Sequence, residues 1–427
     1  MSEQDNLKHI AGKKILILGG TTSSMLVVET AKSMGVYTVV TDMNPLSPAK
    51  RIADKSYDIS TSEIDAIAAL IEEEGIDGVF AAYDDQNTLF AALICEKLDL
   101  PFYATREQIL ATRSKTSFKS ICKQYGVPTV KEYYGSRIEF PCVVKPSDSY
   151  SAKGITICDN ESSLQDAIGY ALEYSPTSQY LIEQFMDPAS TDCVNIEYLI
   201  RDGEIRLAAM GDKYVLSQAE KAPITSAVIY PSVYTHEYVD SEIDEKTKSM
   251  LKGLGVENGM IYIEGFYDSE GFHFYEMGYR LGGGQSSVLL NELQGIDYVK
   301  MLIRYALTAS MCTDEEFELV SPFFMKSSCG LVLHAGIGTI DSMRYDFSSI
   351  HQVKRTTFFL EEGNGVSERY VGTLGQTLAR IHLVCETRGE LLEVINSLLK
   401  KISVLDADGR NLIIPVDTSQ YCPKNFK

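Results

Sequence analysis

The sequence predicts a multidomain protein of the α/β and α+β classes, in which a parallel βαβ domain precedes regions richer in antiparallel strands. The first third of the chain alternates short apolar runs with helical patterns, whereas the middle alternates short strands with hairpin-like turns. A length of 427 residues allows roughly two to four domains. With 44% hydrophobic and 23% charged residues, the composition is that of an ordinary soluble globular protein.

The first third reads as repeated βα units. The apolar run Lys14–Leu18 predicts a strand that ends at Gly19-Gly20, and Thr21–Met34 has a helical pattern. Further strands are expected at Tyr37–Thr41 and Gly78–Ala82, and further helices at Ile64–Glu74 and Gln86–Leu98. Because a helix separates each strand from the next, the strands are expected to form a parallel sheet covered by helices.

The pattern of predicted helices and strands changes near Thr112. A helix over Arg113–Tyr125 is followed by predicted strands at Pro141–Lys145, Gly154–Cys158, Tyr180–Glu183 and Val194–Ile200. Met260–Tyr267 and Phe272–Met277 predict a hairpin, since Asp268-Ser-Glu-Gly271 is a favourable turn sequence. Helices are expected at Asp240–Leu254, Asp297–Ala309 and Glu390–Lys401, with late strands at Gly330–His334 and Leu378–Cys385.

Charge and cysteine usage exclude several classes of function. The net charge of −20 argues against non-specific binding to nucleic acid or to anionic membranes. The polar start does not resemble a signal peptide, and no run approaches the length of a membrane span. Nine cysteines without a CxxC pair and six histidines without an HxxxH pattern indicate reduced thiols in a cytoplasmic protein, without disulfides or zinc.

The Gly19-Gly20 turn has two interpretations. Its amide groups open a helix and could bind an anion, and Asp42 follows about 20 residues later, as in a nucleotide-binding unit. The spacing is not GxGxxG, so a simple tight turn is an equal alternative, and a nicotinamide-dependent oxidoreductase would leave the later motifs unexplained.

Lysines and small residues suggest a phosphate site. Lys145 ends an apolar strand directly before a proline, and the segment Ser147–Gly154 that follows consists mainly of small residues. Such a loop can turn its amide groups toward phosphate oxygens. Farther along, Tyr180–Glu183 runs into a polar hinge, where Phe185 and Met186 could form the apolar walls of an adenine slot.

Two glutamates in the predicted hairpin give the sharpest signal. Glu264 and Glu276 are 12 residues apart, and each could point to the same face. Adjacent carboxylates repel each other unless a cation lies between them, and Mg²⁺ is the usual cation where substrate phosphates also bind. Arg280, followed by Leu-Gly-Gly-Gly, suits a transferring phosphoryl group, although a surface ion-pair set is the alternative for these three residues.

The order of these motifs resembles the ATP-grasp superfamily over nearly the whole chain. Lys115, Lys145, the serine-rich loop, the Glu183 hinge and the Glu264 and Glu276 segments occur in one sequence order. The N-terminal part is similar to the domain before the grasp in biotin carboxylase and in the carbamoyl-phosphate synthase large subunit, and Glu386-Thr-Arg-Gly is similar to the closing domain of L-amino-acid ligases. The resemblance implies a pre-ATP-grasp domain over 1–112, an ATP-grasp domain over 113–310 (a lid lobe over about 113–182 and a larger lobe over about 183–310) and an associated C-terminal domain over 311–427.

The resemblance also implies roles for the residues that match. ATP would be held by Lys115, Lys145, Ser149, Ser151, Ala152, Gly154, Glu183, Gln184, Phe185, Met186 and, at the ribose, Asp192, with Glu197 as the second choice. Glu264 and Glu276 would bind Mg²⁺, or alternatively Mn²⁺, while Arg280 and Lys213 would act in catalysis. Arg344, His334 and Gly336-Ile-Gly-Thr are weaker candidates for an acceptor site.

Two departures from the family pattern concern the metal shell and the loop. Gly278 stands where many members have an asparagine that completes the metal shell, so a water would have to replace that amide. The phosphate loop has one glycine where many members have several, but its serines and Ala152 can still expose amide groups.

These observations predict an ATP-dependent ligase that joins a small carboxylate to an amine through an acyl-phosphate, with ADP and phosphate as products. One alternative is a bicarbonate-using carboxylase or carbamoyl-phosphate-synthase-like enzyme; another is a nucleotide-binding protein without ligase turnover, which the absent asparagine at Gly278 would favour. The sequence identifies neither substrate nor the pathway, and it leaves open whether the chain forms a homo-oligomer.

Overall fold

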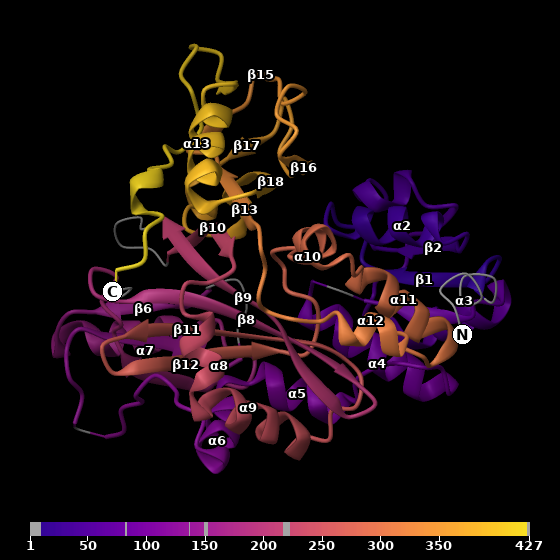
Figure 1. The fold of residues 1–427 in the computed structure, drawn as a ribbon, viewed down its shortest axis with the longest axis horizontal. Helices are drawn as coiled ribbons and strands as arrows, with labels where there is room; N and C mark the ends of the chain where they lie inside the picture. The colour runs from indigo at the N-terminus through magenta and orange to yellow at the C-terminus, as the bar shows by residue number, and fades with distance from the viewer. Residues whose placement is uncertain (1–9, 82, 136, 149–152, 217–222, 425–427) are drawn as a thin grey trace.

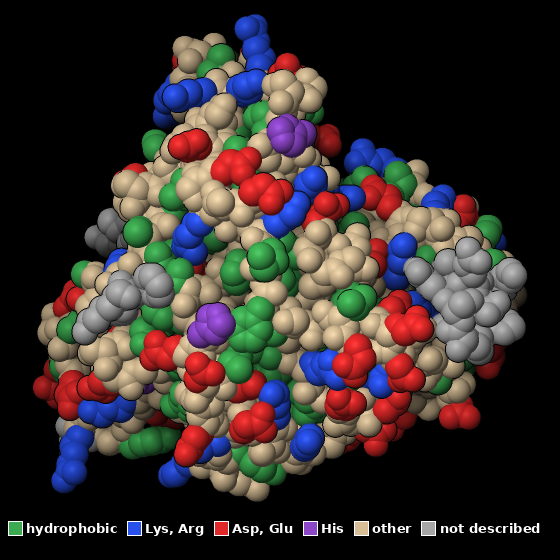
Figure 2. Space-filling view, viewed as in Figure 1, with side chains coloured by type: hydrophobic (Ala, Val, Ile, Leu, Met, Phe, Trp, Pro, Cys, Tyr) green, Lys and Arg blue, Asp and Glu red, His purple; other side chains and the backbone are tan. Residues whose placement is uncertain are grey.

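The computed structural model describes residues 10–424 except 82, 136, 149–152 and 217–222. Figure 1 shows an N-terminal domain at one end of the molecule, a central body with a lobe at its other end, and a C-terminal region that projects from the middle. No helix among the described residues is long and apolar enough to cross a membrane. Figure 2 shows acidic and basic side chains interspersed over one face of the molecule.

The N-terminal sheet is parallel, as the alternating pattern predicts. Its strands are β1 (Lys14–Leu18), β2 (Tyr37–Thr41), β3 (Lys55–Tyr57) and β4 (Gly78–Phe80), in the order β3-β2-β1-β4. Helix α2 (Ser24–Ser33) connects β1 to β2, α3 (Ile64–Glu74) connects β3 to β4, and α4 (Asp85–Leu98) follows β4. The strand order reverses beside β1, which places the start of α4 at the crevice beyond the carboxyl ends of β1 and β4, where open α/β sheets bind ligands.

A small three-stranded sheet forms a separate lobe. Strands β5 (Cys142–Pro146), β6 (Thr156–Cys158) and β7 (Tyr180–Gln184) pair antiparallel in the order β6-β5-β7, and α7 (Leu164–Glu173) packs on them. This lid lobe has its own apolar core. Helices α5 (Arg106–Arg113) and α6 (Lys115–Tyr125) precede it, but α6 packs on α9 (Glu242–Gly253) and β12 (Gly271–Gly278) of the larger lobe.

The central sheet has eight antiparallel strands. Its order is β12-β11-β8-β9-β10-β13-β18-β16, formed by β8 (Asp192–Arg201), β9 (Glu204–Leu216), β10 (Ile224–Tyr230), β11 (Gly259–Asp268), β12, β13 (Ser327–His334), β16 (Val353–Phe358) and β18 (Thr377–Cys385). Because β10 pairs with β13, the sheet continues across residue 311, where the sequence suggests a domain boundary. Backbone hydrogen bonds between β10 and β13 thus join the C-terminal region to the larger lobe. The domain boundaries expected from the sequence, near residues 112 and 310, stay predictions.

The remaining elements cover these sheets. Helix α8 (Thr235–Asp240) precedes α9, and α10 (Ser287–Gln294), α11 (Tyr298–Thr308) and α12 (Asp314–Glu318) follow the hairpin. Helix α13 (Arg388–Leu399) packs on β13 and β18, and short strands β14 (Gly338–Thr339), β15 (Ser342–Tyr345), β17 (Gly365–Val366) and β19 (Ile402–Leu405) complete the C-terminal region.

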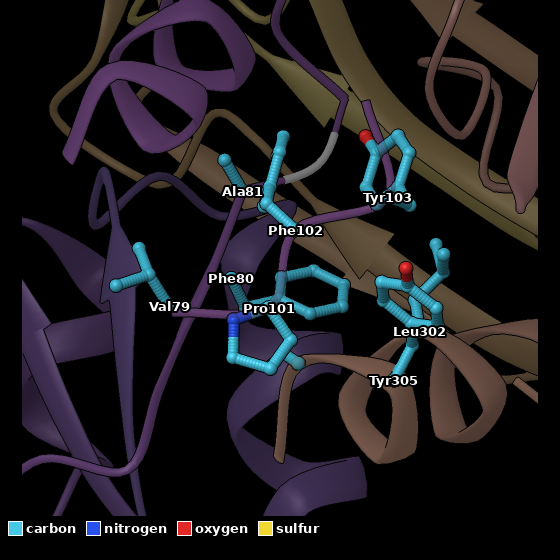
Figure 3. A pocket seen from close by; sticks show the side chains of 9 residues that line it. Val79, Phe80, Ala81, Pro101, Phe102, Tyr103, Leu302 and Tyr305 are labelled. Carbon is cyan, nitrogen blue, oxygen red and sulfur yellow. The ribbon is translucent and has the colours of Figure 1, made fainter. Parts of the chain in front are cut away.

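One apolar core joins the N-terminal domain to the larger lobe. Helix α11 packs on β4, β1 and α2, and buried residues from both regions belong to the same cluster. Figure 3 shows Phe80, Pro101 and Phe102 on one side of this junction and Leu302 and Tyr305 of α11 on the other. The gap between them is only about 10 Å³ and is lined by apolar side chains, so the junction is tightly packed and offers no polar site.

All nine cysteines lie in the described part of the chain and form no disulfide. Cys142 and Cys158 face each other across β5 and β6 but remain free thiols. Burial raises the pKa of Cys142 to about 11, so this thiol is protonated at neutral pH and is a poor nucleophile. Among the described residues there is also no group of three or more His, Cys, Asp or Glu side chains that could hold a metal ion.

Candidate active site

A single large cleft brings together most of the residues that the sequence singles out. It has a volume of about 1760 Å³ and lies between the lid lobe and the central sheet. Strands β5 and β7 line it on the lid side, and β8, β9, β11 and β12 line it on the other. The start of α4 and parts of the C-terminal region also line it, so the N-terminal domain, both lobes and the C-terminal region all contribute to this cleft.

The two hairpin glutamates face each other in this cleft. Glu264 of β11 is the cross-strand partner of Glu276 of β12, despite a bulge directly after Glu264. The Tyr262 hydroxyl donates to Glu276 at 3.2 Å, and the Tyr275 hydroxyl donates to Glu264 at 2.7 Å. Directly opposed like charges are destabilising in a sheet, so the position selects for a cation between them.

Lys213 of β9 places one positive charge beside Glu264. Its ammonium forms an ion pair with Glu264 at 2.6 Å. Burial alone would lower the pKa of Lys213, but the Glu264 carboxylate more than offsets this effect and the pKa is raised. The pKa of Glu264 is correspondingly lowered, since its partners Lys213 and Tyr275 outweigh burial.

The acid pair also fits a hard divalent cation. Both carboxylates line the cleft, and one or two carboxylates plus substrate phosphates are the usual ligands of Mg²⁺ in nucleotide sites. Asn195 of β8 is the cross-strand neighbour of Glu264 on the other side, and its amide donates to Glu197 and to Tyr230. The donor set is therefore oxygen-rich, which suits Mg²⁺ or Mn²⁺ rather than a thiolate-binding metal.

A steric constraint explains why position 278 is a glycine. A Cβ at this position would lie 2.3 Å from the Tyr262 ring, far inside van der Waals contact. The Tyr262 ring thus occupies the space that a side chain at 278 would need, and its hydroxyl contacts Glu276 there. A side chain at position 278 would therefore require the Tyr262 ring to move, a relation that the sequence alone does not reveal.

Arg280 is held by a residue of the N-terminal domain. The carboxylate of Asp85 accepts from its Nε at 2.6 Å and from its Nη2 at 2.9 Å, and Nη2 also donates to Tyr262 at 3.0 Å. Burial alone would raise the pKa of Asp85, but the Arg280 guanidinium outweighs burial and the pKa is lowered. Asp85 was not among the predicted site residues, although two consecutive acids after a buried strand were a visible signal.

The predicted phosphate-binding lysines line the cleft from two elements, Lys145 from β5 of the lid lobe and Lys115 from the start of α6. Lys145 forms an ion pair with Glu183 at 2.5 Å, and Lys119 contacts the same carboxylate at 2.6 Å. Lys115, at the start of α6, is also buried, and burial lowers its pKa while Glu276 acts in the opposite direction. Lys115, Lys145 and Glu183 all line the cleft.

The hinge residues also line the cleft, but the Glu183 side chain turns toward the lysines. Gln184, Phe185 and Met186 follow it along the wall. Any contact with adenine at Glu183 would therefore come from its backbone, while Phe185 and Met186 supply apolar surface. Gly154 has a φ of +76°, a conformation that favours glycine, whereas Ser149, Ser151 and Ala152 lie outside the described residues.

The two candidate ribose acids differ in their surroundings. Asp192 accepts from the Tyr234 hydroxyl at 2.6 Å and from the backbone amide of Lys424 at 2.9 Å. Glu197 is fully buried and accepts from Ser286, Tyr230 and Asn195, and burial raises its pKa. Asp192 lies at the cleft end of β8, so it remains the better candidate for the ribose.

The remaining candidate residues differ in whether they line the cleft. The Asp42 carboxylate accepts from the amides of Gly20 and Asn44, so it stabilises the turn after β1 and is not free for a dinucleotide ribose. His334 lines the cleft, whereas Arg344 of β15 and the Gly336–Thr339 segment do not. Arg380 of β18 lines the cleft although the sequence analysis did not select it.

Comparisons with known proteins agree with this geometry. Residues 15–100 match the PylC-like N-terminal domain, and residues 115–313 match the carbamoyl-phosphate synthase L chain ATP-binding domain. The formate-dependent phosphoribosylglycinamide formyltransferase of Methanocaldococcus jannaschii is 27% identical over 187 residues, which are 41% of this chain. The match spans 48% of that relative, about half its length.

Solved structures share the fold across almost the whole chain. The L-amino acid ligase from Bacillus licheniformis has a TM-score of 0.76 at 20% identity, covering 93% of this chain and 99% of that one. The biotin carboxylase domain of the 2-oxoglutarate carboxylase of Hydrogenobacter thermophilus, in complex with MgADP, ADP and bicarbonate, has a TM-score of 0.74 at 19% identity, covering 92% of this chain and 90% of that one. Residues 115–313 therefore form an ATP-grasp domain of the carbamoyl-phosphate synthase L chain type, and the chain shares the ATP-grasp fold over almost its whole length.

Proposed function

We propose that the protein is an ATP-dependent carboxylate–amine ligase that forms an acyl-phosphate and releases ADP and phosphate. The observation that carries this proposal is the opposed pair Glu264 and Glu276, which shares one cleft with Lys115, Lys145 and Arg280. This arrangement combines a cation site, two phosphate-binding ammonium groups and a fixed guanidinium. Phosphoryl transfer to a carboxylate needs little else, because positioning and charge neutralisation supply most of the catalysis.

Two of the similar proteins support this class of reaction by their names. One is a formate-dependent formyltransferase and the other an L-amino acid ligase, and both names refer to the joining of a carboxylate-derived group to an amine. A third is a biotin carboxylase domain bound to bicarbonate, so bicarbonate is a second candidate for the activated acid. We infer small-molecule substrates here, since the cleft is enclosed by the regions of one chain.

The nucleotide would be Mg-ATP. Gln184, Phe185 and Met186 would form the wall against adenine, Asp192 would meet the ribose, and Lys115 and Lys145 would contact the phosphates. The divalent ion would be held by Glu264 and Glu276, and when bound it neutralises negative charge on the phosphates. Gly154 and the segment before it would close over the phosphates and keep water away.

The chain's own groups then account for the two chemical steps. A carboxylate oxygen of the first substrate attacks the γ-phosphorus of ATP, and the bond from that phosphorus to the bridging oxygen breaks, releasing ADP. Lys213 lies beside Glu264 and neutralises charge near the transferred group. The amine next attacks the acyl carbon, loses a proton and displaces phosphate, while Arg280, held in orientation by Asp85, stabilises the oxyanion of the tetrahedral intermediate.

Phosphate release from Mg-ATP tests the proposal. The purified protein is screened with pairs of carboxylates and amines, with bicarbonate as a separate arm and Glu276→Gln as the inactive variant. Glu270→Gln is the matched control, because Glu270 is an exposed acid in the turn of the same hairpin. We expect release that requires both substrates, persists in Glu270→Gln and is lost in Glu276→Gln.

Other outcomes would redirect the assignment. Release with bicarbonate alone would indicate a carboxylase-type reaction. Binding of ADP without release under any substrate pair would contradict ligase turnover and favour a protein that only binds nucleotide. Full activity of Glu276→Gln would show that the acid pair is not the cation site.

A further inference from the structure

Arg380 is a buried guanidinium without an acidic partner among the described residues. Three arginines of the described chain are buried to this degree, each with 5–8% of its surface exposed: Arg280, Arg304 and Arg380. Arg280 is paired with Asp85, and Arg304 forms two hydrogen bonds to the Glu316 carboxylate at 2.7 and 2.9 Å. Since an unpaired buried charge is strongly unfavourable, we expect Arg380 to bind an anion from outside the chain.

The neighbours of Arg380 supply no negative charge. Its Nη1 donates weakly to the neutral amide of Gln285 at 3.3 Å, and its guanidinium lies 5.3 Å from the centre of the Phe359 ring. Its Nε has no hydrogen-bond partner among the described residues. Burial lowers the pKa of Arg380 to about 10, which still leaves it charged at neutral pH.

Two histidines near Arg380 are neutral as well. His334 donates from Nε2 to the Thr225 carbonyl at 2.7 Å, and His382 donates to the Gly284 carbonyl at 3.3 Å. Burial and the nearby arginine together lower the pKa of His382 to about 3, and burial lowers that of His334. At neutral pH neither histidine contributes charge beside Arg380, and the nearby Arg355 is already paired with Glu29.

The position of Arg380 connects it to the reaction cleft. The residue lines the cleft, as does Val332, its cross-strand neighbour on β13. Its partner Gln285 directly follows the cleft-lining glycines 282–284, which follow Arg280 in the chain. Gln285 also donates to the Ser23 carbonyl at 3.1 Å, which places Arg380 where the C-terminal region meets the N-terminal domain.

We propose that Arg380 binds an oxyanion of the small-molecule substrate, a carboxylate or phosphate group separate from the group that reacts. A guanidinium matches the planar geometry of a carboxylate and the oxygens of a phosphate with paired N–H donors. An anionic substrate would follow for the proposed ligase, so this part of the inference rests on the proposed function. The substrate carries at least one fixed negative charge beyond the acid or amine that is joined, as an amino acid used as the amine would.

Anion binding tests the site without any turnover. Acetate and inorganic phosphate are titrated separately, at constant ionic strength and with saturating MgADP, into the wild type, Arg380→Met, Arg380→Lys and Arg355→Met. Arg355 is the matched control, since it is an arginine of the same sheet region that is already paired with Glu29 at 2.7 Å. The thermal midpoint of unfolding is the readout.

We expect anion-dependent stabilisation in the wild type and in Arg355→Met, a weaker response in Arg380→Lys and none in Arg380→Met. A response to acetate but not phosphate indicates a carboxylate substrate, and the reverse indicates a phosphorylated one. An equal response of Arg380→Met and wild type to both anions, or no response of the wild type, overturns the proposal. A midpoint of Arg380→Met several degrees below that of Arg355→Met, without anions, would show a structural role and overturn it too.

Turnover separates this inference from the proposed function. Once a substrate pair supports phosphate release, we expect Arg380→Met to raise the KM of the anionic substrate about 10- to 100-fold, the value of one charge-assisted bidentate contact. The KM for ATP should stay unchanged. If the wild type never releases phosphate, the ligase proposal fails while the anion titration still decides whether Arg380 is a binding residue.

Discussion

Replacing Glu183 by glutamine tests the electrostatic centre of the lid lobe. Glu183 is 3% exposed, and its carboxylate contacts Lys119 at 2.6 Å and Lys145 at 2.5 Å, which are themselves buried. Burial favours the protonated acid, but the two lysines outweigh burial and hold the pKa of Glu183 below its usual value. Glu183→Gln keeps the volume and removes the charge, so two buried ammonium groups lose their counterion.

The cost follows from the charge that is left unpaired. Removing one partner of a buried ion pair typically costs about 3–5 kcal/mol, because the remaining buried charge has no counterion. We therefore expect Glu183→Gln to lower the free energy of unfolding of the lid lobe by about 3–5 kcal/mol.

The assay is thermal or urea-induced unfolding without and with MgADP. Glu139→Gln is the control, because Glu139 forms an exposed ion pair with Lys131 at 3.0 Å just before the lid strands, and exposed pairs contribute little to stability. If Lys145 meets nucleotide phosphates, MgADP should stabilise Glu183→Gln more than the wild type, because the phosphates replace the lost negative charge. Equal stability of Glu183→Gln and Glu139→Gln would refute the reasoning.

Three further predictions follow from the site. Gly278→Ala should lower the free energy of unfolding by about 1–3 kcal/mol and weaken Mg-dependent nucleotide binding, since its Cβ collides with the Tyr262 ring. Asp85→Asn should lower kcat/KM by about 10- to 100-fold with little change in ADP affinity, because it releases Arg280 from its fixed orientation. His382 has its pKa lowered from 6.5 to about 3, so the unfolded chain binds its proton first as the pH falls. Between about pH 6.5 and about pH 3 the unfolding free energy should therefore drop by up to about 1.4 kcal/mol per pH unit, and His382→Gln should flatten this slope.

Matched controls make these three tests decisive. Gly169→Ala places a Cβ in open space within α7, so a loss of stability equal to that of Gly278→Ala would contradict the steric argument. Asp65→Asn removes an exposed ion pair with Lys97, also in the N-terminal domain, and should leave kcat/KM unchanged. His351→Gln removes an exposed histidine, and a slope reduced as much as in His382→Gln would show that burial is not the cause.

Local patterns were sufficient for the hairpin that carries the acid pair. The turn Asp268–Gly271 and the alternation of apolar residues predict both strands, and the structure confirms that Glu264 and Glu276 are cross-strand partners. The parallel N-terminal sheet is confirmed for the same reason, because the period of apolar residues distinguishes its strands from the helices between them.

Contacts between distant segments were not predictable. Asp85 and Arg280 are 195 residues apart, and no spacing rule connects them. Tyr262 explains Gly278 only once the two strands are seen side by side. The Glu183 side chain could have faced adenine or the lysines, since a strand pattern shows which residues share a face but not which charged group packs against that face.

The transfer of oxygen from the carboxylate substrate to phosphate tests the proposed reaction most directly. A substrate pair that supports phosphate release is supplied with ¹⁸O in both carboxylate oxygens, and the released phosphate is analysed by mass spectrometry. An acyl-phosphate requires that one labelled oxygen remains bonded to phosphorus when the amine displaces phosphate, so we predict one ¹⁸O in each phosphate released. Phosphate without label would contradict the acyl-phosphate and show that ATP is cleaved by water or activates the acid in another way.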